Sequence, residues 1–209
     1  MRDCVILLEK YILFFIGLRG AKNKERNKSI MKIKNKKTWI SVLILITIEQ
    51  TIKIVINNNF LDKRFPILPP LLYFEPMFNR HYSWFNSMLQ LGIGKWVHIA
   101  LVGAMSILIY LFYQFLNKRF GANKVVNIMF AFVFSGAICS LVDKVLWNGS
   151  LDYILVNGLF TFDLKDVYIN TFNGFLILLA FLKNKALKNV DDKNILKDFS
   201  QYVLRKLHI

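Results

Sequence analysis

Apolar residues along the chain gather into four long runs, with polar or charged residues between them. The runs cover about residues 39–56, 96–116, 125–146 and 166–182. Each has about the length that a helix needs to cross the hydrocarbon of a bilayer, roughly 20 residues. Because a backbone in hydrocarbon must satisfy its own hydrogen bonds, we expect each run to be a helix. The pattern therefore predicts an all-α membrane protein with four transmembrane helices.

The longest connection, residues 57–95, contains all 4 prolines of the chain and many aromatic residues. Proline excludes a long helix through its first part, and such aromatic residues are typical of the membrane–water interface. We expect an outer interfacial region with extended structure, which leaves room for a small β-sheet, and a short helix over about 84–91. The last residues, 183–209, have the apolar spacing of an amphipathic helix, which predicts a helix on the inner leaflet.

Basic residues indicate the side of the membrane on which each connection lies. They cluster before the first run, after the second and after the fourth, at Lys32–Lys37, Lys118–Lys124 and Lys183–Lys188. Since lysine and arginine collect in cytoplasmic loops, all three clusters predict that both ends of the four-helix arrangement face the cytoplasm. The net charge of +15 is then explained by topology and by contact with membrane phospholipid, so we expect no nucleic acid as partner.

Residues 1–30 contain a short apolar segment, residues 4–18, that Glu9 and Lys10 interrupt. It is compatible with a surface helix, a weak signal-like segment or a start-site artefact. Met31 favours the start-site artefact, because it is followed by a basic segment and then by an apolar run, which is the pattern expected after a natural start. We therefore expect three parts: an N-terminal extension (1–30), a four-helix domain (31–182) and a basic amphipathic tail (183–209).

Metal-ligating residue types are sparse and scattered. The chain has 2 cysteines and 3 histidines, and their spacing predicts neither a disulfide framework nor a zinc motif. We therefore expect no metal and no cofactor.

A short stretch between the third and fourth runs concentrates acidic residues in this basic chain. Residues 147–170 contain Asp152, Asp163 and Asp166 and a single basic residue, Lys165, and the predicted topology places them on the outer side. Two neighbouring carboxyls in a poorly hydrated site do not both ionise, so the pair shares a proton. Aspartic proteases use such a pair to activate water and to donate a proton. We predict that Asp152, in the loop after the third run, and Asp166 form this pair.

Carboxylates near a helix start also have an ordinary structural role. They accept hydrogen bonds from free N–H groups and interact favourably with the helix dipole. Asp163 fits this role well, and Asp166 lies where the fourth helix is predicted to begin. In the first run, Glu49 and Lys53 are four residues apart and share a helix face. We expect them to pair, either as a structural ion pair or as support for a functional site.

The order of these motifs resembles the lipoprotein signal peptidase family (signal peptidase II), a family of intramembrane aspartic peptidases. The resemblance covers about residues 31–182. Leu151-Asp152-Tyr153 and Phe162-Asp163-Leu164-Lys165-Asp166 resemble the two family motifs that carry the catalytic aspartates, at the family's spacing. The resemblance therefore implies that Asp152 and Asp166 are the catalytic residues.

Further motifs of the family have counterparts that differ in detail. The first-helix motif resembles Glu49-Gln50 followed by Lys53, the outer-loop motif resembles Asn79-Arg80-His81, and the motif that ends the third helix resembles residues 139–144. The resemblance implies supporting or substrate-binding roles for Asn79, Glu49, Lys53, Ser140, Asp143, Lys144 and Asp163. Relative to the family pattern, Glu49 replaces Asp, Ser140 replaces Asn, Lys144 replaces Arg, Asp163 replaces Asn and Lys165 replaces Ala.

The function implied by this resemblance is the removal of signal peptides from bacterial prolipoproteins. The substrate would carry diacylglycerol on a cysteine, and cleavage would fall just before that cysteine. The enzyme would be an aspartic endopeptidase of the bacterial cytoplasmic (inner) membrane, with its active site toward the outer face. The departures from the motifs motivate a second hypothesis, a catalytically inactive homologue that binds lipoprotein signal segments. A third is a small ion-coupled membrane carrier that uses Glu49, Lys53 and the aspartates as a relay.

Overall fold

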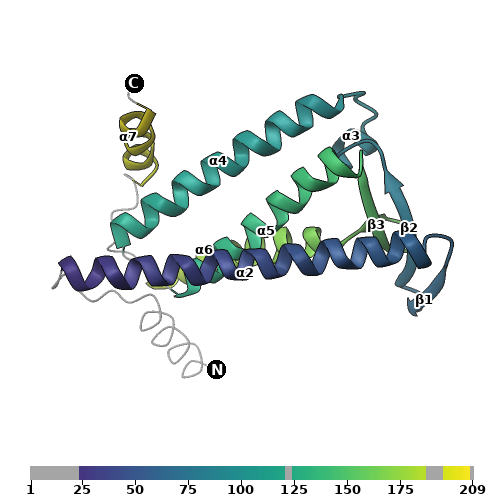
Figure 1. Cartoon of the computed structure of the whole chain (residues 1–209), viewed down its shortest axis with the longest axis horizontal. Helices are drawn as coiled ribbons and strands as arrows, with labels where there is room; N and C mark the ends of the chain where they lie inside the picture. Colours follow the sequence, from purple (N-terminus) through teal and green to yellow (C-terminus); the bar gives the residue numbers. More distant parts are fainter. Residues whose placement is uncertain (1–23, 121–123, 187–194, 208–209) are drawn as a thin grey trace. The chain divides into compact units, whose positions relative to one another are not determined.

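The structure is a computed structural model that describes residues 24–120, 124–186 and 195–207. The long helices in these ranges coincide with the four apolar runs and are labelled in Figure 1: α2 (Lys24–Asn59), α4 (Lys95–Phe120), α5 (Lys124–Leu146) and α6 (Leu164–Ala186). The helix α2 begins well before the predicted start at residue 39, because the basic segment that precedes the apolar run is also helical. The apolar segment 4–18 lies outside the described residues.

Among the described residues, three helices are long and apolar enough to cross a membrane, over Lys36–Asn59, Lys95–Arg119 and Lys124–Leu146. Large apolar side chains along the first two of these segments are exposed, among them Leu43, Ile44, Leu101, Met105 and Ile107. Exposed apolar surface of this kind suits lipid rather than water. The chain is therefore a mostly helical membrane protein.

Four strands in the described part of the chain form one antiparallel sheet in the order β1-β2-β3-β4. The strands are β1 (Phe65–Leu68), β2 (Leu72–Asn79), β3 (Ser150–Val156) and β4 (Phe160–Phe162). The first two come from the proline-containing connection, where extended structure was predicted. The other two come from the acidic stretch, which was interpreted as a loop. That interpretation was wrong, because residues 151–156 are rich in the apolar and aromatic types that suit a strand.

The central pairing of the sheet joins two distant segments of the chain. Strands β2 and β3 are antiparallel partners, with Met77 opposite Asp152 and Asn79 opposite Ser150. Gly149 allows this approach, because a Cβ atom there would lie 2.8 Å from the carbonyl oxygen of Asn79. The pairing therefore holds Asp152 on a fixed strand rather than in a flexible loop.

Two close contacts bring the helices to the sheet. A Cβ atom at Gly136 of α5 would lie 2.5 Å from Cγ1 of Ile169, so this glycine allows the close approach of α5 and α6. A small apolar core around Ile56, Leu151 and Tyr153 joins the end of α2 to β3. These contacts place the end of α2, the end of α5 and the start of α6 around β3.

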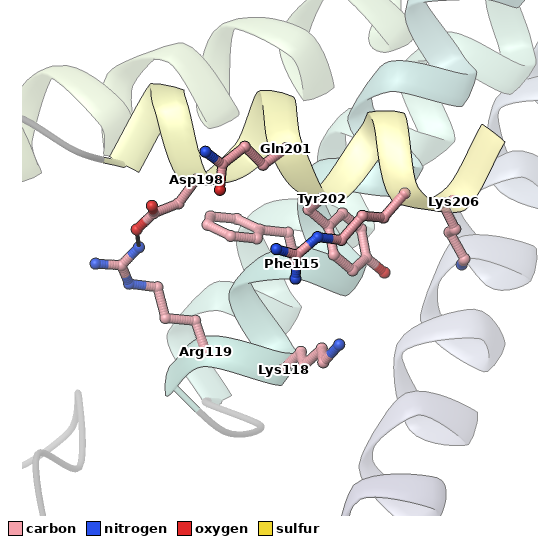
Figure 2. A pocket seen from close by; sticks show the side chains of 8 residues that line it. Phe115, Lys118, Arg119, Asp198, Gln201, Tyr202 and Lys206 are labelled. Atoms are coloured by element: carbon pink, nitrogen blue, oxygen red, sulfur yellow. Dashed lines mark hydrogen bonds and ion pairs between the residues drawn. The ribbon is translucent and has the colours of Figure 1, made fainter. Parts of the chain in front are cut away.

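The chain divides into two compact units. One, the sheet unit, consists of residues 41–107 and 132–170; the other, the tail unit, contains the described parts of 1–40, 108–131 and 171–209. The sheet unit also contains a short helix, α3 (Trp84–Met88), within the range predicted for one. In the tail unit, α7 (Ile195–Leu207) is the predicted C-terminal helix, and its basic and aromatic side chains border the end of α4 (Figure 2).

Candidate active site

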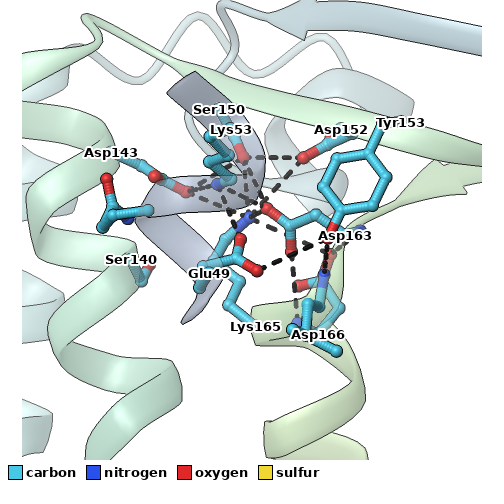
Figure 3. Close-up of polar contacts among 12 residues, drawn as sticks. Glu49, Lys53, Ser140, Asp143, Ser150, Asp152, Tyr153, Asp163, Lys165 and Asp166 are labelled. Carbon is cyan, nitrogen blue, oxygen red and sulfur yellow. Dashed lines mark hydrogen bonds and ion pairs between the residues drawn. The ribbon is translucent and has the colours of Figure 1, made fainter. Parts of the chain in front are cut away.

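Glutamate, aspartate and lysine side chains from four segments of the sheet unit meet beside β3 (Figure 3). The residues are Glu49 and Lys53 on α2, Asp143 near the end of α5, Asp152 on β3, and Asp163, Lys165 and Asp166 at the start of α6. The local structure explains which of them converge. Residues four apart on a helix share a face, as Glu49 and Lys53 do on α2, and residues two apart on a strand share a face, as Ser150 and Asp152 do on β3.

Lys53 is the buried cation on the α2 side of the site. Its Nζ lies 3.1 Å from Oε1 of Glu49, 2.6 Å from Oδ2 of Asp143 and 2.6 Å from Oδ2 of Asp163. An ammonium group has three donors, so each N–H has a carboxylate to meet. The predicted Glu49–Lys53 contact is therefore present, as part of a larger network. Burying these charges is tolerable only because they are paired.

Lys165 is a second buried cation and lies closest to the predicted catalytic pair. Its Nζ is paired with Asp163 and donates a 2.6 Å hydrogen bond to Oγ of Ser150. The same Nζ is 3.5 Å from Oδ1 of Asp152 and 4.0 Å from Oδ2 of Asp166. With only 8% of its side chain exposed, Lys165 is a component of the site rather than a solvated surface residue.

Asp152 is held by the strand and by its neighbour on the same face. Oγ of Ser150 lies 2.6 Å from Oδ1 of Asp152, the shortest of its contacts with carboxylates. Burial raises the pKa of Asp152, the Lys165 ammonium lowers it in part, and the nearby Asp163 carboxylate raises it again. Asp152 therefore gains protons more readily than an exposed aspartate.

Asp163 is the anion that binds both lysines. Burial alone would raise the pKa of Asp163, but the Lys165 and Lys53 ammonium groups outweigh burial and hold that pKa well below its usual range. Asp163 therefore remains ionised throughout the range in which proteins are usually studied.

Asp163 and Asp166 also cap the start of α6. The N–H of Asp163 donates to Oδ2 of Asp166, and the N–H of Asp166 donates to Oδ1 of Asp163, each at 3.2 Å. This reciprocal arrangement is a capping box, so the structural role predicted for a carboxylate at this helix start is present. The capping contact fixes the Asp166 carboxyl, while 38% of its side chain remains exposed.

The carboxylates of Asp152, Asp163 and Asp166 offer oxygen atoms that all lie within 4.8 Å of one another. Such a set has the ligand chemistry of a metal site. Here the ammonium of Lys165 contacts all three carboxylates at 4.0 Å or less. The positive charge among these acids is thus supplied by a side chain of the protein.

Three of the predicted supporting residues, Asn79, Ser140 and Lys144, form hydrogen bonds with residues near them in the sequence and not with the charged groups of the site. Nζ of Lys144 lies 2.8 Å from Oγ of Ser140, one helical turn earlier on α5. Asn79 ends β2 and accepts a 3.0 Å hydrogen bond from the N–H of His81, which shapes the turn after the strand. Asn79 is tied to the site through its strand partner Ser150. The structure thus brings together Glu49, Lys53, Asp143, Asp152, Asp163 and Asp166, with these three beside them.

Sequence reasoning did not identify Ser150, Tyr153 or Lys165 as members of the site. The Tyr153 hydroxyl accepts a 3.1 Å hydrogen bond from the N–H of Leu164 and lies 3.5 Å from Oε2 of Glu49. Ser150 is two residues before Asp152, and this spacing places both side chains on one face only if the segment is a strand. Lys165 was noted as the single basic residue of its stretch, and that isolation was the available signal.

Helices long and apolar enough to span a membrane, joined to a small sheet beside buried paired charges, define a class of helical membrane protein with a carboxylate site. The family model described as signal peptidase (SPase) II matches residues 41–182. The chain therefore belongs to the signal peptidase II family, which consists of aspartic peptidases, and the family resemblance of its motifs is confirmed. Its membrane location and its place among the proteases of lipoprotein processing follow from this membership.

Individual relatives agree with the family assignment. Proteins named lipoprotein signal peptidase from Brucella ovis and Brucella canis are each 26% identical over 159 residues, which cover 72% of this chain and 94% of theirs. Two solved structures, titled as bacterial membrane enzymes studied by the in meso method, share the fold. Their TM-scores are 0.57 and 0.56 at 16% and 17% identity, covering 75% and 74% of this chain and 94% and 95% of theirs.

Proposed function

We propose that the chain is an active lipoprotein signal peptidase. It removes the signal peptide of a prolipoprotein that carries diacylglycerol on a cysteine, and it cleaves just before that cysteine. The observation that carries the proposal is the convergence of Asp152 and Asp166, with carboxylate oxygens within 4.8 Å, inside the region that matches the family. Two carboxyls this close share a proton and have the chemistry of an aspartic peptidase pair.

In the proposed reaction the ionised carboxylate of the pair takes a proton from water as the water oxygen attacks the peptide carbonyl. The protonated carboxyl donates toward the carbonyl oxygen, and a proton later reaches the leaving amine. Lys53 and Asp163 form a buried ion pair beside the two aspartates and balance each other's charge. No step requires a metal or an organic cofactor.

The proposed topology has four crossings, with α6 as the fourth and both ends in the cytoplasm. It places the site toward the outer face of the bacterial cytoplasmic membrane, on the side opposite the basic clusters. Strand β1 and the turn after it expose Phe65, Ile67, Leu68 and Leu71, which suit contact with lipid or with the lipidated end of a substrate. Within the proposed division of the chain, 31–182 is the peptidase domain, with the extension 1–30 before it and the tail 183–209 after it.

Cleavage of a purified, diacylglyceryl-modified prolipoprotein tests the function and the pair together. Wild type should cleave, whereas Asp152→Asn and Asp166→Asn should each lose about 10²–10⁴-fold in rate, because each removes a group that transfers a proton. Asp62→Asn, in an exposed aspartate of the same unit, is the matched control and should retain the full rate. Thermal unfolding of each variant separates lost chemistry from lost folding. A folded Asp152→Asn protein that cleaves at the wild-type rate would rule out the assignment.

A second candidate is a homologue that binds lipoprotein signal segments without cleaving them. The observation that favours it is the Lys165 ammonium, which lies 3.5 Å from Asp152 and can neutralise the carboxylate that must activate water. This candidate predicts photocrosslinking to the lipidated substrate with no product, under lipid and detergent conditions in which a known signal peptidase II is active. The carrier hypothesis predicts ion flux into proteoliposomes that depends on Asp166, and the grouping of charges beside one sheet gives it less support.

A further inference from the structure

The two members of the proposed pair have unequal surroundings. Oδ1 of Asp152 lies 2.6 Å from the Ser150 hydroxyl and 3.5 Å from Nζ of Lys165. Oδ2 of Asp166 lies 4.0 Å from the same Nζ and accepts a backbone N–H at 3.2 Å. A nearby positive charge and a hydrogen-bond donor both stabilise an ionised carboxylate. Asp152 lies closer than Asp166 to the Lys165 ammonium, and its hydrogen-bond donor is also closer.

Ser150 connects Lys165 to Asp152. Nζ of Lys165 donates to Oγ of Ser150 at 2.6 Å, so this oxygen uses a lone pair toward the lysine. The single hydroxyl proton of Ser150 remains available for Asp152, its closest carboxylate. The contact with the ammonium polarises the hydroxyl and strengthens its donation to Asp152.

We propose that Lys165 is a positioning residue that keeps Asp152 ionised, directly and through Ser150, so that Asp152 is the base and Asp166 the acid. Asp163 is the counter-ion that Lys165 requires, and the two residues act as one unit. This proposal rests on the proposed peptidase function. It extends that function by dividing the roles of the two aspartates.

The counter-ion part of the proposal follows from the charges. Asp163 contacts the ammonium groups of both Lys53 and Lys165. Removal of Lys165 leaves an excess of negative charge beside Asp152, and removal of the Asp163 carboxylate leaves an excess of positive charge. Removal of both returns the balance, so the two single changes should have opposite effects that cancel.

The experiment is the pH dependence of kcat/KM for wild type, Lys165→Ala, Asp163→Asn and the double variant. Loss of the ammonium makes ionisation of Asp152 harder, so the acidic limb of Lys165→Ala should move to higher pH by about one unit, a tenfold loss on that limb. The limb of Asp163→Asn should move to lower pH, and the double variant should lie within about threefold of wild type. Lys63→Ala, an exposed lysine of the same unit, should match wild type.

A second variant keeps the proposal testable if Lys165→Ala does not fold. Ser150→Ala removes the hydroxyl between Lys165 and Asp152, and its acidic limb should move in the same direction by a smaller amount. An active Lys165→Ala or Ser150→Ala enzyme with the wild-type acidic limb would overturn this inference and leave the peptidase function intact. A double variant slower than both single variants would show a merely structural role. Inactive wild type would instead overturn the peptidase function itself.

A separate observation concerns the tail unit. A pocket of about 610 Å³ lies between the end of α4 and α7, and its lining includes Lys118, Tyr202, Arg205 and Lys206. Figure 2 shows that basic side chains surround the aromatic rings of the pocket. Among them, Arg119 is paired with Asp198, the single acidic residue of the lining. The cations of the pocket therefore outnumber its carboxylates.

The place of this pocket along α4 suggests its ligand. The segment of α4 that is long and apolar enough to span a membrane ends at Arg119, so the pocket borders the end of α4 that would leave the hydrocarbon. Nζ of Lys118 and Nζ of Lys206 lie 5.6 and 5.9 Å from the Tyr202 ring centroid, which gathers two ammonium groups over one ring. We infer that the pocket binds the phosphodiester of an anionic phospholipid, and that Tyr202 and Phe115 contact the apolar part of the same lipid.

Native mass spectrometry of the full chain in neutral detergent tests this site. Phosphatidylglycerol should bind wild type about tenfold more tightly than it binds the Lys118→Ala/Lys206→Ala variant. The affinity of phosphatidylcholine should differ only slightly between the two proteins. Lys63→Ala should bind phosphatidylglycerol as wild type does. Equal phosphatidylglycerol affinity for wild type and the double variant would overturn the site. Displacement of phosphatidylglycerol by millimolar inorganic phosphate would assign the pocket to a free anion instead of a lipid.

Discussion

Two groups of charges in this molecule use the same residue types in opposite surroundings. In the sheet unit, Lys53 and Lys165 are buried and have a carboxylate at nearly every N–H. In the tail unit, Arg205 and Lys206 are exposed and belong to a pocket with one acidic residue. Burial makes an unpaired charge costly, so the first group is balanced from within. The second is balanced by solvent, or by an anion that arrives from outside.

The largest expected effect comes from breaking the buried group. Lys53→Met would leave the carboxylates of Asp143 and Asp163, which are fully buried, without the cation that they share. We expect a loss of about 3–5 kcal/mol in the free energy of unfolding. Denaturant unfolding in detergent measures it, with Lys63→Met as the control, expected to change stability by about 0.5 kcal/mol or less. A Lys53→Met protein as stable as this control would show that the network contributes nothing to folding.

Acid should weaken the same network through Asp163. The pKa of Asp163 is lower in the folded protein than in the unfolded chain, so its contribution to stability is present above its unfolded pKa. That contribution begins to fall as the pH drops below about 4, the unfolded pKa, and it continues to fall toward the lower pKa of the folded protein. The difference in unfolding temperature between wild type and Asp163→Asn, measured from pH 7 to pH 3, should therefore become smaller toward the acid end. Parallel curves would mean that Asp163 does not carry this dependence.

A smaller effect is expected at the neutral edge of the network. Tyr153→Phe removes the hydroxyl that accepts the N–H of Leu164 and leaves that N–H without this partner. We expect a loss of about 1–2 kcal/mol in the free energy of unfolding, the usual cost of a buried donor left unsatisfied. Thermal unfolding of the variant measures it. The rate of cleavage at the optimum pH should fall less than it does in Asp152→Asn.

The smallest effect is expected where a charge pair faces solvent. Arg64 and Glu75 are 3.7 Å apart, with 73% and 33% of their side chains exposed. Arg64→Ala should change the free energy of unfolding by about 0–1 kcal/mol, because water and salt screen the pair. A double-mutant cycle with Glu75→Ala isolates the interaction. A coupling as large as the Lys53 effect would contradict the explanation by burial.

The helices and the aspartates at the start of α6 could be predicted from the sequence because both have local signals, whereas the catalytic role of Asp152 and Asp166 stays a prediction. A spanning helix is a run of apolar residues, and a capping aspartate stands at the start of such a run. The acidic stretch was interpreted as a loop, and its strand β3 depends on a partner, β2, more than seventy residues earlier in the chain. Strand pairing over that distance leaves no periodic pattern in one short segment, so the shared face of Ser150 and Asp152 could not be seen.

The role of Lys165 escaped for a different reason. In the sequence it is a lysine beside two aspartates, which is also the pattern of a solvated helix start. Only the fold shows that α2, α5 and β3 bring Lys53, Asp143 and Asp152 to the same place as Lys165. The departures from the family pattern at Asp163 and Lys165 were considered one at a time, whereas their charges meet in a single contact.

The pairing of β2 with β3 has a mechanical consequence. Met77 and Asp152 are direct partners, and β2 also forms a hairpin with β1. A force on the β1–β2 hairpin therefore acts on the strand that holds Asp152, across a single row of hydrogen bonds. In the proposed reaction, a substrate that rests on that hairpin is therefore linked through one strand pairing to the carboxylate of Asp152.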